Sequence, residues 1–174
     1  MTKNLVVYFS KDGEQYGVGE ITEGNTAVLA KIIAAKLKAD LFEIKLKNDT
    51  YPKGYEPLTK VALSEKKAKA RPEIEEMAAD FAQYDTVFLG CPNWWADMPM
   101  AVYSFIEKYD WSDKRIAPFV THEGSGMSGI DTKIAAAANP KEVLNGLEMY
   151  GHIAQNQREE ATQRVDVWLK KSGF

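Results

Sequence analysis

The chain has 174 residues, of which 45% are hydrophobic and 27% charged, and a formal net charge of -3 at pH 7. This length suits one globular domain, expected to span residues 1–174, with a core that needs no disulfide or structural metal. The composition excludes a disordered or collagen-like chain. The mildly acidic charge argues against a nucleic-acid partner, because nucleic-acid binders normally present a basic face.

Cys91 is the single cysteine, so no intramolecular disulfide can form and a reducing compartment is expected. The segment before Ser10 has too few apolar residues for a signal peptide or a membrane span. We therefore expect a cytoplasmic protein with no membrane partner.

The first third of the chain predicts a strand, a loop, a helix and a second strand. Residues 5–9 are continuously apolar, which is typical of a central strand covered on both faces. Residues 10–24 contain four glycines and predict a loop. An apolar stripe predicts a helix from Asn25 or Thr26 to about Leu37, and residues 41–46 predict a second strand nearer the sheet edge.

The middle third begins with a long surface connection that contains a short helix. Its lysine-rich run, SEKKAKARP, is expected to be a solvated face. Pro72 predicts the start of a helix that ends near Phe81. Residues 86–90 predict a buried third strand, which opens into a loop with adjacent Trp94 and Trp95.

The remaining residues predict three helices and two strands. Asp97 is expected to cap a helix that buries Ala101, Val102, Phe105 and Ile106. Residues 115–120 and 143–147 predict the fourth and fifth strands, and residues 130–138 and 157–171 predict helices. Strands that alternate with helices indicate an α/β fold, with an open parallel sheet wrapped on both faces.

In such a sheet, the ligand crevice lies beyond the carboxyl ends of the strands, where the connection order reverses. The loop after the first strand offers Ser10 and Lys11, then Gly24, Asn25 and Thr26 at a helix N-terminus. Backbone N–H groups and the helix dipole make this place suited to a phosphate. Asn25 and Thr26 can also simply cap the helix, and the two roles are compatible.

The tryptophan loop, residues 92–97, has indole faces that can stack on a flat ring system. We expect Trp95 to cover the ring and Trp94 to be partly structural. The loop after the fourth strand contains Gly124, Gly126 and Gly129, a formal G-x-G-x-x-G match. Because this match does not follow the first strand of its βαβ unit, it favours close backbone approach to a ligand edge over a dinucleotide fingerprint.

No catalytic or metal-binding residue is assigned. His122 and Ser125 lack the G-x-S-x-G elbow of a hydrolase, and His152 is remote in sequence. The two histidines and the cysteine show no metal-ligand spacing.

Three motifs in this order resemble the flavodoxin-like family: YFS with GNT, then FLGCPNWWADMP, then THEGSG. The resemblance implies a three-layer α/β/α sandwich around a five-stranded parallel sheet of order 2-1-3-4-5, for which flavodoxin is a standard example. It also implies one non-covalent FMN, with its phosphate on Ser10, Asn25 and Thr26. The implied ring contacts are Pro92, Asn93, Trp94, Trp95 and Ala96, and the ring edge lies near Thr121, His122, Glu123, Gly124 and Gly126.

The phosphate loop departs from the family pattern, because about eleven further residues separate Ser10 from Asn25. We hypothesise that this insertion forms a flap over the flavin and that Tyr16 contacts the ring. Glu123 is expected to lower the redox potential by like-charge repulsion.

The leading expectation is a low-potential electron carrier between redox partner proteins, a reductase and an acceptor. The alternative is an FMN-dependent NAD(P)H oxidoreductase that acts on quinones or another small electron acceptor. A monomer and a homodimer are both compatible with the sequence.

Overall fold

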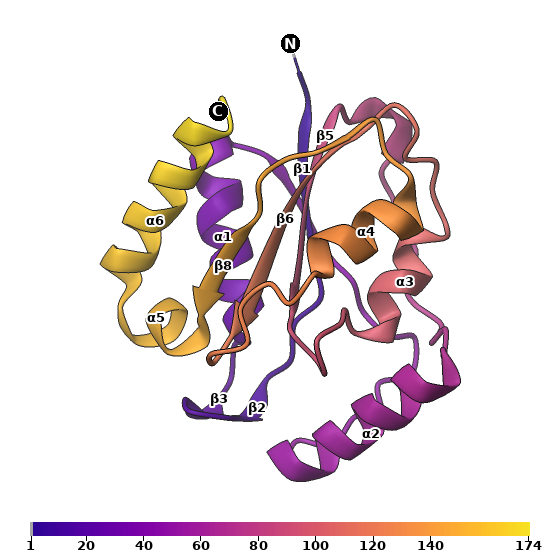
Figure 1. The fold of residues 1–174 in the computed structure, drawn as a ribbon, viewed down its shortest axis with the longest axis vertical. Helices are drawn as coiled ribbons and strands as arrows, with labels where there is room; N and C mark the ends of the chain where they lie inside the picture. Colours follow the sequence, from indigo (N-terminus) through magenta and orange to yellow (C-terminus); the bar gives the residue numbers. More distant parts are fainter. Residues whose placement is uncertain (1) are drawn as a thin grey trace.

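The computed structural model describes residues 2–174 and has a parallel sheet between two layers of helices (Figure 1). Strand β1 lies inside the sheet and pairs in parallel with β4 and β5, and β6 follows β5. The fifth position is shared by two short strands, β7 and β8, which both pair with β6. The order 2-1-3-4-5 is therefore confirmed. The strands are β4 (Asp40–Glu43), β1 (Asn4–Tyr8), β5 (Thr86–Pro92), β6 (Arg115–His122), β7 (Glu142–Val143) and β8 (Leu147–Tyr150).

The helices form the two outer layers of the sandwich. One face of the sheet carries α1, α5 and α6, and the other carries α3 and α4, with α2 beyond them near the carboxyl ends of the strands (Figure 1). This arrangement confirms the predicted α/β/α architecture. The helices are α1 (Asn25–Leu37), α2 (Tyr55–Ala68), α3 (Met100–Ile106), α4 (Ile130–Ala138), α5 (Gly151–Asn156) and α6 (Arg158–Lys171).

The alternation of side chains along β1 explains its unbroken apolar run. Leu5 and Val7 pack into the core under α3 and α4, whereas Val6 and Tyr8 pack into the core under α1 and α6. A strand that separates two cores has no polar face, because successive side chains point to opposite sides.

The predicted loop at residues 10–24 contains a small antiparallel hairpin. Strands β2 (Gly13–Gln15) and β3 (Gly19–Ile21) pair with each other and form a separate sheet below the carboxyl ends of the main strands (Figure 1). The insertion is therefore an ordered projection beside the crevice.

The helix predicted from Pro72 to Phe81 is wrong. Residues 73–75 are extended and pair with residues 45–47 through an antiparallel bridge between Leu46 and Ile74. The N–H of Glu75 donates to Lys45 O at 2.8 Å, and a single 3₁₀ turn follows at Phe81–Gln83. Tertiary pairing outweighs the helical spacing of the apolar residues, since Ile74 is buried in the core through this bridge.

Three further boundaries differ from the predictions. The helix expected from Asp97 begins at Met100, and the Asp97 carboxylate instead accepts hydrogen bonds from the Met98 N–H and the Tyr103 hydroxyl, both at 2.7 Å. The strand predicted at residues 143–147 is split into β7 and β8. The short helix α5 precedes the predicted terminal helix.

Across residues 2–174, every helix falls short of the length and apolar character that a membrane crossing requires.

Candidate functional site

A cavity of about 250 Å³ opens where the loops after β5 and β6 meet the hairpin and α2. We call it the ring pocket. Its walls carry aromatic side chains together with amide, imidazole and carboxylate groups, a mixture suited to a flat polar ring system. It is lined by Gln15, Tyr16, Asn25, Tyr55, Pro92, Asn93, Trp94, Thr121, His122, Glu123 and Ser125.

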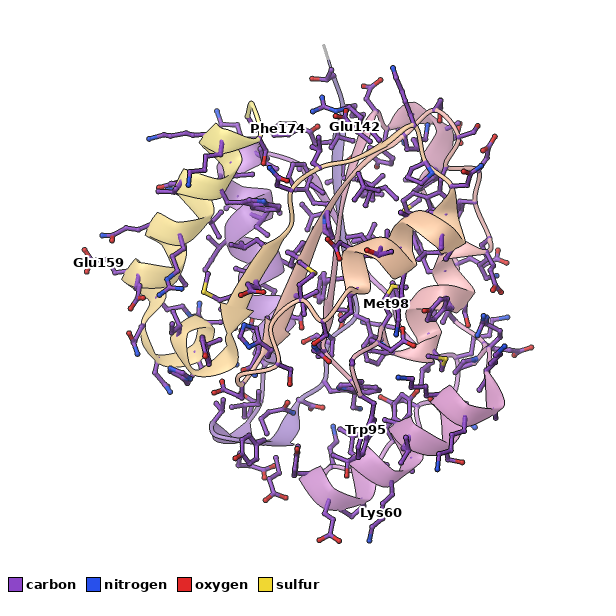
Figure 2. The ribbon with its side chains drawn as sticks, viewed as in Figure 1. Lys60, Trp95, Met98, Glu142, Glu159 and Phe174 are labelled. Carbon is purple, nitrogen blue, oxygen red and sulfur yellow. The ribbon has the colours of Figure 1, made fainter. Side chains whose placement is uncertain are left out.

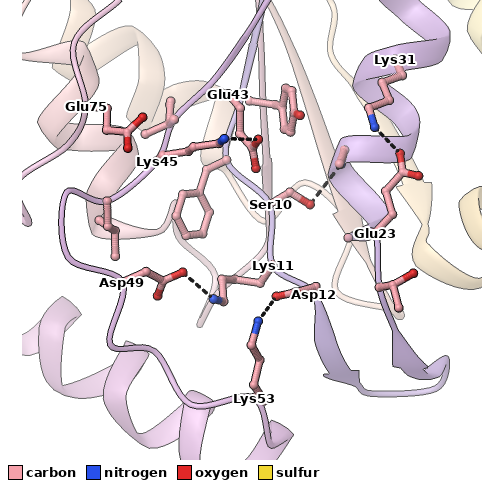
Figure 3. Close-up of a pocket in the computed structure, with 17 residues that line it drawn as sticks. Ser10, Lys11, Asp12, Glu23, Lys31, Glu43, Lys45, Asp49, Lys53 and Glu75 are labelled. Atoms are coloured by element: carbon pink, nitrogen blue, oxygen red, sulfur yellow. Dashed lines mark hydrogen bonds and ion pairs between the residues drawn. The ribbon is translucent and has the colours of Figure 1, made fainter.

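A second cavity, of about 480 Å³, lies beyond β1 and β4 and is lined by charged side chains (Figure 3). Ser10, Lys11 and Gly24 are among its lining residues. The Lys11 ammonium is buried and pairs with Asp49 at 3.0 Å. Lys11 is thereby directed away from the ring pocket, although the sequence suggested it as a phosphate contact.

The N-terminus of α1 borders the ring pocket through Asn25. Within residues 2–174, the N–H groups of Asn25 and Thr26 have no hydrogen-bond acceptor. The Asn25 side-chain Oδ1 is also buried without a partner. Unpaired N–H groups at the positive end of a helix suit an anion, so this terminus fits a phosphate group.

Ser10 and Gly24 are in close contact at the N-terminus of α1. Ser10 Oγ accepts a hydrogen bond from the Ala27 N–H at 3.1 Å and so caps α1. A Cβ on Gly24 would lie 2.0 Å from Ser10 Oγ, so only glycine allows this approach. The Thr26 hydroxyl is buried and bonds the Thr121 hydroxyl at 2.7 Å, which ties the start of α1 to the end of β6.

The two tryptophans lie in different surroundings, and Trp94 has the partly structural position expected of it. Trp94 lines the ring pocket and packs edge-on against Phe9 and Tyr51, with ring centroids 5.4 and 5.6 Å away. Trp95 lies outside the ring-pocket lining, between the strand ends and α2 (Figure 2), where its Nε1–H donates to Thr59 O at 2.9 Å. The physical reason is the left-handed backbone at Trp95 (φ 58°) and Ala96 (φ 56°), which turns the chain between the two indoles.

Asn93 joins the two loops that form the pocket. Its Nδ2–H₂ donates to Gly126 O and to Ser128 Oγ, each at 2.9 Å, and its backbone N–H donates to Thr121 O at 2.9 Å. Gly126, Gly124 and Ala96 are outside the lining of the pocket, and each hydrogen-bonds to Asn93 or His122, which line it.

His122 and Glu123 give the pocket its polar wall. His122 Nδ1 accepts the Gly124 N–H at 2.9 Å, which leaves the ring proton on Nε2 in the neutral imidazole. Burial lowers the pKa of His122, and the nearby carboxylates of Glu148 and Glu123 oppose this shift. Neutral His122 is therefore a hydrogen-bond donor toward a ligand.

The hairpin and α2 cover the outer side of the ring pocket. Tyr16, at the hairpin turn, packs against Tyr55 at the start of α2, with the rings tilted and their centroids 5.7 Å apart. The hairpin is held by the Glu14 N–H, which donates to Lys53 O at 2.9 Å, and by Glu14 Oε2, which accepts the Tyr55 N–H at 2.9 Å. The two elements form one cover with an aromatic pair over the pocket.

A family model described as Flavodoxin matches residues 3–167. The chain belongs to the flavodoxin family. Family membership assigns FMN as the cofactor, as the resemblance implied. The unpaired N–H groups of α1 and the aromatic walls of the ring pocket fit its phosphate and its ring.

Solved structures of similar fold are proposed or established flavoproteins. A proposed flavoprotein from Bacteroides eggerthii is 23% identical, with a TM-score of 0.75 and coverage of 100% of this chain and 99% of its own. A proposed flavoprotein from Bacteroides uniformis is 25% identical, with a TM-score of 0.71 and coverage of 95% and 98%. A flavoprotein from Lactobacillus acidophilus, crystallised with FMN, is 20% identical, with a TM-score of 0.70 and coverage of 97% and 99%. No functionally curated protein has a matching sequence.

Of the residues expected at this flavodoxin site, seven line the ring pocket: Asn25, Pro92, Asn93, Trp94, Thr121, His122 and Glu123. Sequence reasoning missed Gln15, Tyr55 and Ser125, which also line it. Ser125 lies in the THEGSG motif that the resemblance places near the ring edge, but no contact is assigned to it there. Tyr55 carries no sequence signal, because its place depends on how α2 docks.

Proposed function

We propose that this flavodoxin carries electrons at low potential between redox partner proteins. The supporting observation is the size and cover of the ring pocket. Its volume of about 250 Å³ lies below the roughly 300–1,000 Å³ of sites that enclose drug-sized ligands. The hairpin and α2 cover its outer side. Such a pocket suits one ring system with an exposed edge, as a carrier requires.

Bound FMN supplies reversible uptake of electrons, and the protein binds, orients and tunes it. The N–H groups of Asn25 and Thr26 would hold the phosphate, and Trp94 would offer an apolar face to the ring. Neutral His122, whose Nδ1 accepts the Gly124 N–H, would donate from Nε2 to an acceptor at the ring edge. Tyr16 of the cover and Trp95 beside α2 are 63% and 47% exposed, so both would be available to a docking redox protein.

Glu123 supports the low potential. Its side chain lines the ring pocket and is 16% exposed, so its charge is only partly screened by water. Added negative charge on the ring is therefore disfavoured. Glu123→Gln is expected to raise the FMN midpoint potential, and unmoved potentials would show that Glu123 does not tune the ring.

Anaerobic mixing of the purified yellow protein with NADPH tests the carrier role. A carrier stays yellow with NADPH alone and bleaches when a catalytic amount of an NADPH-dependent flavodoxin reductase is added. Bleaching by NADPH alone would replace the proposal with an NAD(P)H oxidoreductase that acts on quinones or similar acceptors. A colourless protein that FMN does not restore would overturn both functions.

A further inference from the structure

Glu123 and His152 form a carboxylate–imidazole pair beside the ring pocket. Glu123 Oε1 accepts the backbone N–H of His152 at 2.7 Å, and Oε2 lies 2.8 Å from the ring Nδ1 of the same residue. The Glu123 side chain lines the pocket, whereas His152 stands behind it in α5. Two hydrogen bonds from one residue therefore fix both carboxylate oxygens.

The surroundings leave His152 as the charge partner of Glu123. Within the part of the chain from residue 2 to 174, His152 is the single group that forms an ion pair with Glu123. The other titratable groups that face the pair are Tyr150 and Glu148 of β8 and His122 of β6. The Tyr150 ring lies tilted between the two imidazoles, with ring centroids 4.5 Å from His122 and 5.1 Å from His152, and Glu148 Oε2 accepts the Met127 N–H at 2.8 Å.

We propose that His152 is a positioning residue that holds the Glu123 carboxylate in the wall of the ring pocket and, when protonated, cancels the charge that this carboxylate presents to the flavin. The inference rests on the proposed binding of FMN in this pocket. Glu123 alone presents one negative charge, and the pair with an imidazolium is neutral. Protonation of His152 therefore makes the pair neutral, and loss of that proton leaves the carboxylate charge facing the pocket.

The consequence is a coupling between pH and the affinity for reduced FMN. The reduced ring carries more electron density than the oxidised ring, so a neutral pair favours it and a lone carboxylate disfavours it. Coupling free energies are reciprocal between two sites, so the protonation of His152 and the binding of reduced FMN strengthen each other. The ratio of oxidised to reduced dissociation constants should therefore fall as the pH rises.

Three substitutions separate the two roles of His152. His152→Asn keeps a neutral amide donor near the place of Nδ1 but cannot become a cation. His152→Ala removes the donor as well, and Glu123→Gln removes the carboxylate charge. Glu159→Gln is the matched control, because it makes the same change in net charge at an exposed position of α6 (Figure 2), outside the lining of the ring pocket.

The experiment measures dissociation constants of each intact protein for oxidised FMN and for FMN reduced with dithionite, at about pH 5.5 and about pH 8.5, on either side of the histidine range. At the acid pH, His152→Asn should bind reduced FMN about tenfold more weakly than the natural protein, with oxidised binding unchanged. Tenfold corresponds to about 30 mV for a two-electron couple. At the alkaline pH, this variant should match the natural protein.

Glu123→Gln should bind reduced FMN about tenfold more tightly at the alkaline pH, and Glu159→Gln should change neither constant. His152→Ala should also weaken the binding of oxidised FMN. His152→Asn should bind oxidised FMN as tightly as the natural protein does. The ring's own protonation is common to all variants and cancels in these comparisons.

The same pH dependence in His152→Asn and the natural protein would overturn the inference while leaving FMN binding intact. Failure of the natural protein to bind FMN would instead overturn the proposed function. If far-ultraviolet circular dichroism shows that His152→Asn does not fold, Glu123→Gln decides, because unchanged reduced binding at the alkaline pH contradicts the proposal.

Discussion

Trp94 and Trp95 are neighbours in sequence, yet one faces the ring pocket and the other faces α2. We expect Trp94→Phe to weaken FMN binding about tenfold, because aromatic contacts contribute about 0.5–1.5 kcal/mol beyond area burial and the smaller ring also leaves part of the wall empty. Trp95→Phe should stay within about twofold. Titration of apo-protein with FMN, followed by quenching of flavin fluorescence, checks both variants. Stronger weakening in Trp95→Phe would restore the original expectation.

The sequence could predict that this loop is aromatic but could not orient its side chains. The turn depends on left-handed backbone at two consecutive non-glycine residues, Trp95 and Ala96. L-residues rarely adopt this conformation, so local propensity does not predict it. Contacts from distant segments support it, since Lys66 donates to Trp95 O and Lys133 to Ala96 O. His152 was overlooked for a similar reason, because its pairing with Glu123 depends on how α5 follows β8.

Cys91 is packed at the end of β5, and its thiol should not react with thiol reagents in the native protein. Its burial raises the pKa of the thiol, with a smaller contribution from the Asp97 carboxylate. The thiolate is the reactive form, so a disulfide reagent should not modify the folded protein at pH 8. The same protein in concentrated urea serves as the control and should react with one equivalent. Rapid labelling without denaturant would contradict the buried position.

The cover formed by the hairpin and α2 depends on a close backbone contact at Gly13. Gly13 (φ +91°) and Gly19 (φ +94°) both have positive φ angles, but a Cβ would lie 2.6 Å from Lys53 O at Gly13 and meet nothing within 4 Å at Gly19. Each alanine substitution adds backbone strain of about 1 kcal/mol. We expect only Gly13→Ala also to lift the hairpin from the segment before α2.

Stopped-flow dissociation of FMN measures this effect on the cover. Gly13→Ala should release FMN severalfold faster than Gly19→Ala, because the aromatic pair above the pocket loses its support. Replacement of residues 13–22 by a short linker should release FMN at least as fast. Equal rates in the natural protein, both alanine variants and the shortened protein would show that the hairpin does not retain the cofactor.

At the scale of elements, predictions succeeded where a segment's own pattern was sufficient. The apolar run of β1 and the stripe of α1 specify those elements locally. The helix prediction failed at residues 73–75. Their apolar spacing suits a helix, but pairing with residues 45–47 buries Ile74 more effectively. The fifth strand was placed correctly in the order but not in its extent, since the chain leaves the sheet at residues 144–146 and re-enters at Leu147.

At the scale of the whole molecule, the order of elements was sufficient to locate the site. Alternating strands and helices imply a parallel sheet, and the reversal of connections beside β1 creates the crevice at its carboxyl end. The loops after β1, β5 and β6 therefore had to converge, and residues of all three line the ring pocket. The cover was unpredictable, because the docking of the hairpin and α2 depends on contacts between segments about forty residues apart, such as Glu14 with Tyr55.

The site joins the two layers of the sandwich, so its ligand should stabilise the molecule as a whole. Asn25 belongs to α1 on one face, and Trp94 packs against Phe9 and Tyr51 in the core of the other face. A ligand at 100 times its dissociation constant adds about 2.7 kcal/mol to the free energy of unfolding. For a chain of this length, FMN should then raise the melting temperature by about 5–10 °C.

Scanning calorimetry of apo-protein with increasing FMN measures the shift, and riboflavin, which lacks the phosphate, is the matched control. Because we propose that the α1 terminus holds the phosphate, we expect riboflavin to give a clearly smaller shift at equal concentration. An equal shift would mean that the unpaired N–H groups of Asn25 and Thr26 do not bind the phosphate, and no shift with either ligand would contradict FMN binding in the ring pocket.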